Sequence, residues 1–139
     1  MSITVRVRDA MDTDVVFIDA EKTVMDALNK MLKSRVWSLV VEKRGLPIGV
    51  VTERDTIRRC ISKGTDPKRR TVEEIMSSPL VTIDPDVPIG EAMKLMVEKD
   101  IRRVYVIDDG KIIGRVTQTG AFKHMLDVVR TLSSIPYQL

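Results

Sequence analysis

The stretch Gly49-Val-Val-Thr52-Glu-Arg-Asp55 is the one around which the chain is organised. Two branched apolar residues lead from a glycine into Thr52, and Asp55 follows three positions later, which predicts the end of a strand and the start of a helix. The first backbone N–H groups of such a helix have no internal partners and carry partial positive charge, so the junction can hold a phosphate. A carboxylate one turn further on can accept hydrogen bonds from the hydroxyls of a ribose. The stretch is therefore compatible with a nucleotide site.

The same residues also fit a simpler interpretation. Thr-x-x-Glu is the capping box of a helix, and Asp is a shorter version of the same device. On this interpretation Thr52 and Asp55 satisfy each other's backbone and bind nothing. The rest of the chain has to decide between the two.

The chain contains an internal repeat. Gly49 and Gly114 lie 65 residues apart, and the same offset aligns both halves without a gap. It pairs Met11 with Met76, and it continues through further matched residues, among them Val7 with Val72, Ile18 with Ile83, Ala27 with Ala92, Gly45 with Gly110, and Thr52 with Thr117. A chance alignment would not extend over so many elements, so two copies of one structural unit are expected.

Each half is predicted to have the element order β-α-β-β-α. In the first half the elements are a strand over 15–18, a helix capped by Thr23 with its apolar face on Val24, Ala27, Leu28, Met31 and Leu32, strands over 36–41 and 47–52, and a helix from 53 to about 63. The second half repeats them, with a short helical turn over 72–76 that mirrors 7–11, a strand over 80–83, a helix over 89–99, strands over 104–107 and 111–117, and a last helix from Thr117.

The predicted fold class is mixed α/β (α+β). We expect a first repeat over 1–64, a basic linker over 65–71, a second repeat over 72–132, and a tail over 133–139 with no assigned role. One three-stranded sheet with two helices cannot close a core alone. The two repeats are therefore expected to pack sheet to sheet with pseudo-two-fold symmetry, which would place the strand-to-helix junctions in clefts between them.

Composition excludes several classes of protein. The 139 residues are 43% hydrophobic and 31% charged, which is typical of an ordinary globular domain. No apolar run approaches the roughly 20 residues that a membrane span needs, and Cys60 is the only cysteine, so an internal disulfide and a cysteine metal cluster are impossible. His124 has no second histidine or cysteine beside it, so no metal site is expected. We expect a cytoplasmic protein.

The chain resembles the paired CBS domain, also called a Bateman module, over roughly residues 7–129. The resemblance rests on Asp-x-x-x-x-Val-x-x-Ala-Leu in the first helix, on the hairpin Val-Val-Glu-Lys-Arg-Gly-Leu-Pro-Ile-Gly-Val-Val, and on Thr-Glu-Arg-Asp. It implies a stand-alone regulatory module that binds an adenine nucleotide between the repeats and modulates a protein on another chain. It also implies a homodimer and no enzymatic activity.

The resemblance carries over to particular residues. The family pattern Gly-x-x-Thr/Ser-x-x-Asp is matched by Gly49, Thr52 and Asp55, which places Asp55 on the ribose and the hydroxyl near the phosphate. The basic pair that the family often has before its second strand is matched by Arg102 and Arg103, which favour an anionic ligand. The nucleotide-binding residues that the resemblance implies are Thr52, Arg54, Asp55, Leu80, Val81, Ile83, Arg102 and Arg103, with the adenine against Leu80, Val81 and Ile83.

Only one working site is expected. The second copy has Gly120 where the ribose carboxylate should be, and the first copy has Trp37-Ser38 where the second has Arg102-Arg103. Thr117 can cap its helix without an acidic partner, so the architecture does not require Asp55. Trp37 fits a packing or dimer contact better than a stacking platform for a base. Because arginines alternate along a strand start, either Arg102 or Arg103 could simply face solvent.

The ligand stays open among AMP, ADP and ATP, with S-adenosyl-methionine disfavoured by the two arginines; no cofactor is expected. An alternative function is a nucleic-acid-binding adaptor that uses the basic segment 58–70, since the chain carries a net charge of +3 and part of that excess lies there. No nucleic-acid-binding motif accompanies the segment. An enzyme has no support, because no nucleophile–base pair is visible.

Overall fold

The computed structural model describes residues 5–136. It divides into two compact units, a first unit of residues 14–81 and a second unit that joins the N-terminal segment up to residue 13 with the chain from residue 82 onward.

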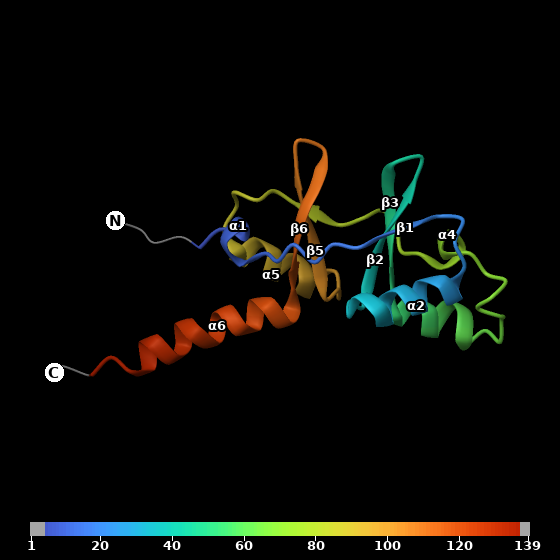
Figure 1. The fold of residues 1–139 in the computed structure, drawn as a ribbon. Coiled ribbons are helices and arrows are strands. Elements are labelled where there is room, and N and C mark those ends of the chain that lie inside the picture. Colours follow the sequence, from blue (N-terminus) through green and yellow to red (C-terminus); the bar gives the residue numbers. More distant parts are fainter. Residues whose placement is uncertain (1–4, 137–139) are drawn as a thin grey trace. The chain divides into compact units, whose positions relative to one another are not determined.

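The first unit is a three-stranded sheet with helices (Figure 1). Its strand order is β1-β2-β3, with β1 parallel to β2 and β2 antiparallel to β3. The elements are β1 (Phe17–Asp19), α2 (Val24–Ser34), β2 (Ser38–Lys43), β3 (Leu46–Thr52), α3 (Glu53–Thr56), the π-helix η1 (Ile57–Ile61) and α4 (Val72–Ile75). The predicted order of strands and helices is thus confirmed for the first repeat.

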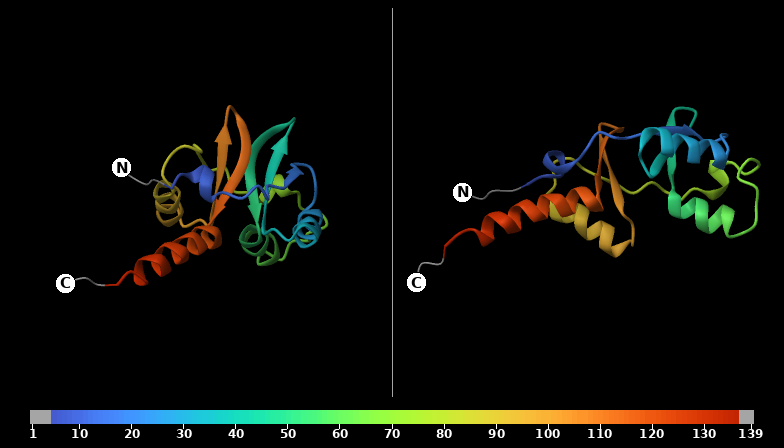
Figure 2. Two further views of the ribbon diagram at one scale, coloured as in Figure 1. Left: turned by 60° about the vertical axis from the view of Figure 1, so that its left-hand side comes forward. Right: turned by 60° about the horizontal axis from the view of Figure 1, so that its bottom comes forward.

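The second unit repeats this arrangement in the order β4-β5-β6. Its elements are α1 (Val7–Ala10), β4 (Thr82–Ile83), α5 (Ile89–Glu98), β5 (Arg103–Asp108), β6 (Lys111–Thr117) and α6 (Gln118–Ser133). The C-terminal turns of α6 extend away from the rest of the unit in every view (Figure 2). The mixed α+β fold class with two sheets is therefore confirmed.

The 65-residue offset of the sequence holds in the strand register. Val41 pairs with Gly49 in the first sheet, Val106 pairs with Gly114 in the second, and each hairpin has a register shift directly after that pair. Both hairpin turns use two residues with positive φ, Arg44-Gly45 and Asp109-Gly110. Two successive positive φ angles match the right-handed twist of a hairpin, which explains why a glycine recurs in both turns.

The core of the first unit is formed by one face of α2 against the sheet. Val24, Ala27 and Met31 are buried there with Leu39, Val41 and Val51. The prediction that Leu32 belongs to this apolar face is wrong, because its side chain is exposed. It follows Met31 directly, and consecutive helical residues point about 100° apart, so both cannot lie at the centre of one stripe.

The short helix of each repeat belongs to the unit of the other repeat. Val7 at the start of α1 donates to the carbonyl of Val87 in the second unit, and Val72 at the start of α4 donates to the carbonyl of Lys22 in the first. Segment 65–71, which the sequence indicates as a linker, is held against the start of α2. Met25 donates to Pro67 and Val24 donates to Arg70, at 2.9 and 2.8 Å.

The helix predicted from 53 to about 63 is divided in the structure. Its first turn is α-helical, residues 57–61 are wound as a π-helix, and Gly64 lies beyond it with φ of +70°. A π-helical turn adds one residue per hydrogen-bonded ring and is frequent at functional sites. The side chains of Ile57 and Ile61 are exposed on it, and Cys60 is buried.

Candidate functional site

The junction of β3 and α3 is a complete capping box. The backbone N–H of Thr52 donates to Oδ2 of Asp55 at 2.9 Å, and the backbone N–H of Asp55 donates to Oγ1 of Thr52 at 3.2 Å. The Thr52 hydroxyl donates to the same carboxylate oxygen at 3.1 Å. The simpler interpretation of Thr-x-x-Asp is therefore realised in the fold, and any ligand has to be accommodated beside it.

Asp55 is more than a cap, because it is almost fully buried and reaches a distant segment. The residue is only 6% exposed. Its second oxygen, Oδ1, accepts a hydrogen bond of 2.9 Å from the hydroxyl of Ser77, which lies 22 positions further along the chain. Buried carboxylates are rare unless paired or fully hydrogen-bonded, so these contacts explain how Asp55 is tolerated there.

The equivalent junction in the second unit works without a carboxylate. The backbone N–H of Gly120 donates to Oγ1 of Thr117 at 3.0 Å, so the threonine alone caps α6. At the position equivalent to Ser77 stands Asp12, whose Oδ1 accepts from Nε of Arg115 at 2.8 Å. The buried acid at the first junction is thus a feature of that junction and not of the repeat.

Another capping box in the first unit shows what the device does when it is only structural. Thr23 and Asp26 exchange the same two backbone hydrogen bonds, at 3.0 and 3.1 Å, on the exposed start of α2. The hydrogen bonds from the backbone and side chain of Thr23 hold the pKa of Asp26 below its usual value. Asp26 therefore stays ionised and capped at neutral pH, and it provides a matched comparison for Asp55.

The predicted site residues fall in both units. Thr52, Arg54, Asp55, Leu80 and Val81 belong to the first, and Ile83, Arg102 and Arg103 belong to the second. Arg102 is exposed and its carbonyl accepts from the N–H of Gln118 at 2.7 Å, whereas Arg103 begins β5 and is half-buried. Arg54 is exposed on α3, Leu80 and Val81 are half-buried, and Ile83 is buried.

Trp37, which stands where the second repeat has Arg102, is 48% exposed, and its carbonyl accepts from the N–H of Glu53.

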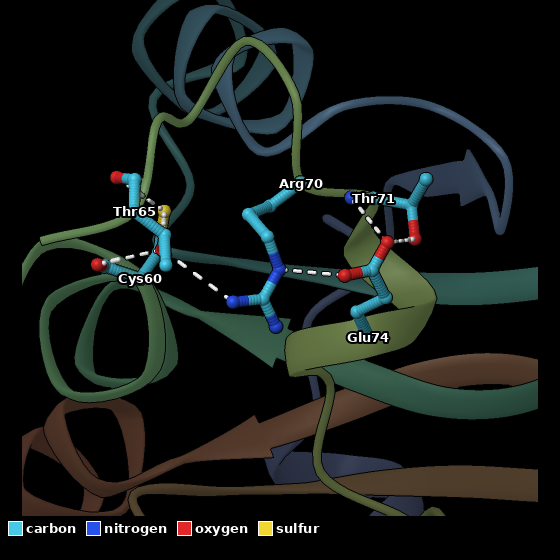
Figure 3. A network of polar contacts seen from close by, with 5 residues as sticks. All are labelled: Cys60, Thr65, Arg70, Thr71 and Glu74. Carbon is cyan, nitrogen blue, oxygen red and sulfur yellow. Dashed lines mark hydrogen bonds and ion pairs between the residues drawn. The ribbon is translucent and has the colours of Figure 1, made fainter. Parts of the chain in front are cut away.

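Part of the basic segment 58–70 is used inside the first unit. Nη1 of Arg59 donates to the carbonyls of Ile75 and Met76, at 3.2 and 2.7 Å. Nε of Arg70 donates to Glu74 at 2.6 Å, and its Nη1 reaches the Thr65 hydroxyl, which is bonded in turn to the carbonyl of Cys60 at 2.9 Å (Figure 3). The bond from Arg70 holds the pKa of Glu74 below its usual value. These two arginines stabilise the fold.

The roles of Ser77 and Arg59 near the junction could not be predicted from the sequence. Ser77 and Arg59 each contact a segment distant from their own in the chain, and neither belongs to a recognisable motif. The repeat offset gives no signal for Ser77, because its partner under that offset is the acidic Asp12. Their roles come from the exchange of the short helices between units.

Between residues 5 and 136, no three or more histidine, cysteine, aspartate and glutamate side chains gather in a way that could hold a metal ion. None of the helices in that range combines the length and the apolar character that a membrane crossing requires.

Comparison with known proteins agrees with the fold and its repeat. The family model of the CBS domain matches the chain twice, over residues 7–62 and 72–127. The chain belongs to the CBS-domain family. Paired CBS domains are generally regulatory, ligand-binding modules and are typically not enzymes.

Relatives of this CBS-domain chain include proteins of archaea and bacteria. An uncharacterized protein of Methanopyrus kandleri, MK0525, is 38% identical over 116 residues, which cover 82% of this chain but 59% of that protein. The CBS domain-containing protein YhcV of Bacillus subtilis is 31% identical over 110 residues, 79% of this chain and 78% of the relative. The crystal structure of a hexameric CBS-CP12 protein from bloom-forming cyanobacteria matches with a TM-score of 0.81 and 30% identity, over 87% of this chain and 68% of that one.

Proposed function

We propose that the chain is a regulatory module that binds an adenine nucleotide, with the ribose on Asp55. The observation that carries the proposal is the difference between two equivalent junctions. Both helices are capped by a threonine, yet only the first has a buried carboxylate, and the second forms its cap with Gly120 in that place. A buried carboxylate that the repeat does not need is a candidate for ligand recognition.

The proposal retains Arg102 and Arg103 as the groups that recognise the phosphate, as the family pattern implies. Arginine keeps its charge and can form two parallel hydrogen bonds with a phosphate. Leu80, Val81 and Ile83 supply the apolar contact for adenine. Thr52 contributes by holding the Asp55 carboxylate in place through its N–H and hydroxyl, and Arg54 is the remaining residue that the family pattern implies. Bound nucleotide regulates a protein on another chain, which requires that the nucleotide bind two states of this module with different affinity.

Titration calorimetry tests the proposal directly. Wild-type protein is expected to bind AMP, ADP or ATP saturably, and more tightly than S-adenosyl-methionine, because the arginines favour an anion. Replacing both Arg102 and Arg103 with glutamine should weaken AMP binding by about tenfold or more, since hydrogen bonds to charged groups contribute about 1.5–3 kcal/mol each. Adenosine, which has no phosphate, should bind the variant as it binds the wild type.

The control for that experiment is Arg58→Gln, which removes one positive charge at an exposed position of η1. Its AMP affinity should stay near that of the wild type. If the control loses as much affinity as the Arg102/Arg103 variant, the effect is one of general charge. Equal loss of adenosine and AMP binding in the Arg102/Arg103 variant would show that the arginines do not recognise the phosphate.

Self-association is the second part of the proposal. Helix α6 exposes large apolar side chains along its length, and a homodimer would cover them: Phe122, Met125, Leu126, Val128, Val129 and Leu132. We expect a dimer by light scattering at micromolar concentration, and a shift toward monomer for Val129→Asp combined with Leu132→Asp. A wild-type monomer, or a variant that remains dimeric, would exclude α6 as the dimer contact.

A further inference from the structure

The hydrogen bonds on Asp55 leave little room for a ribose. Oδ2 accepts from the backbone N–H and from the hydroxyl of Thr52, and Oδ1 accepts from the hydroxyl of Ser77. An ionised carboxylate offers about four acceptor positions on its two oxygens. Three of them are therefore in use, and a ribose brings two hydroxyl donors.

The three hydrogen-bond donors to Asp55 differ in how easily each can give up its bond to the carboxylate. The N–H of Thr52 is an unpaired donor at the start of a helix, and the carboxylate is its partner in the cap. The Thr52 hydroxyl is also committed, since it accepts from the N–H of Asp55 while it donates to the carboxylate. Ser77 contacts Asp55 through one hydrogen bond, which its hydroxyl donates. A hydroxyl can rotate and donate to another acceptor or to water instead.

The backbone around Ser77 is fixed independently of its side chain. Its N–H and C=O form both hydrogen bonds of a bridge with Val50, at 2.8 and 2.9 Å. Arg59 holds the carbonyl of the preceding residue, Met76, at 2.7 Å. The Ser77 hydroxyl can therefore leave Asp55 without moving the segment that carries it.

We propose that the ribose of the bound nucleotide displaces the Ser77 hydroxyl from Oδ1 of Asp55, so that Ser77 lowers the affinity of the site. This inference rests on the proposed function. Ser77 stabilises the ligand-free state by one hydrogen bond that the bound state lacks. The nucleotide must replace that bond before it gains from the carboxylate, and the affinity is set lower by the free energy of the bond.

The test is a calorimetric comparison of the wild type with Ser77→Ala. The variant should bind AMP about threefold to tenfold more tightly, which is the size expected for one net hydrogen bond. It should also unfold at a lower temperature without ligand, because Asp55 loses a donor. The control is Ser78→Ala, at the exposed neighbouring position, which should leave the AMP affinity unchanged.

Deoxynucleotides test whether the ribose hydroxyls and the Ser77 hydroxyl compete for Asp55. An AMP analogue with a single ribose hydroxyl, 2′-deoxy-AMP or 3′-deoxy-AMP, needs only the one acceptor position that is still open on Asp55. For such an analogue the gain from Ser77→Ala should disappear, whereas for AMP it should persist. If Ser77→Ala increases the affinity for AMP and for both deoxynucleotides by the same factor, the ribose and Ser77 do not compete for Asp55 and the inference is wrong.

The remaining outcomes also decide the question. If Ser77→Ala lowers the unfolding temperature and leaves the AMP affinity unchanged, the Ser77 hydroxyl is purely structural and the inference is wrong. If the variant binds AMP more weakly, Ser77 assists the ligand and the inference is also wrong. If the wild type binds no adenine nucleotide at all, the proposed function fails together with the inference, and this result is distinct from the other two.

Discussion

Asp55→Ala is expected to weaken the binding of AMP and ATP by at least about tenfold, and by as much as a few hundredfold if both ribose hydroxyls reach the carboxylate. A hydrogen bond to a charged acceptor contributes about 1.5–3 kcal/mol, and each 1.4 kcal/mol changes a dissociation constant tenfold. Titration calorimetry at a temperature well below the unfolding transition measures the change. Circular dichroism establishes that the variant is folded under the same conditions.

The same substitution also removes a helix cap, so the experiment needs a control that separates the two effects. Asp26→Ala removes the other Thr-x-x-Asp box of the first unit, whose two backbone hydrogen bonds match those of Asp55. Each variant should lose about 1 kcal/mol of stability from its cap, and Asp55→Ala should lose more in total, because it also leaves the Ser77 hydroxyl without its partner. Only Asp55→Ala should lose nucleotide affinity. Equal nucleotide binding by both variants would reduce Asp55 to a structural residue and remove the proposed ribose contact.

Much of the fold could be predicted because the repeat doubles every local signal. The glycines at 45 and 110, the threonine caps at 52 and 117, and the paired glycines at 49 and 114 all occupy equivalent places in the structure. Each is a local device whose chemistry determines the backbone around it, namely a turn, a cap or a close approach. Local rules are sufficient for such features, and a repeated occurrence makes chance an implausible explanation.

The environment of the candidate site could not be predicted in the same way. The contact between Ser77 and Asp55 depends on α4 lying in the first unit although it follows the first repeat in the chain. The use of Arg59 to hold the carbonyls of Ile75 and Met76 depends on the same packing. These are tertiary effects, and neither periodicity nor a motif indicates them.

Gly49→Ala is expected to destabilise the protein more than any cap substitution. A Cβ at this position would lie 2.6 Å from the carbonyl oxygen of Ser77 and 2.9 Å from Sδ of Met76. The first of these is a backbone atom that is bonded to Val50, so it cannot move without breaking the bridge. Overpacking costs about 1–3 kcal/mol, and each bridge hydrogen bond contributes about 0.5–1.5 kcal/mol. We expect a loss of about 2–4 kcal/mol in the free energy of unfolding, measured by urea denaturation.

Two further glycines make the result interpretable. At Gly90, on α5, an added Cβ meets nothing within 4 Å, so Gly90→Ala should stabilise the protein by about 0.5–1 kcal/mol through helix propensity alone. At Gly114 the Cβ would lie 2.7 Å from the carbonyl oxygen of Asp12, so Gly114→Ala should be as harmful as Gly49→Ala. Only Gly49→Ala should also displace Ser77, the partner of Asp55, because the clash at Gly114 is with Asp12 and Met11 instead. A Gly49→Ala protein of wild-type stability would mean that β3 and the segment after α4 do not approach as closely as the fold requires.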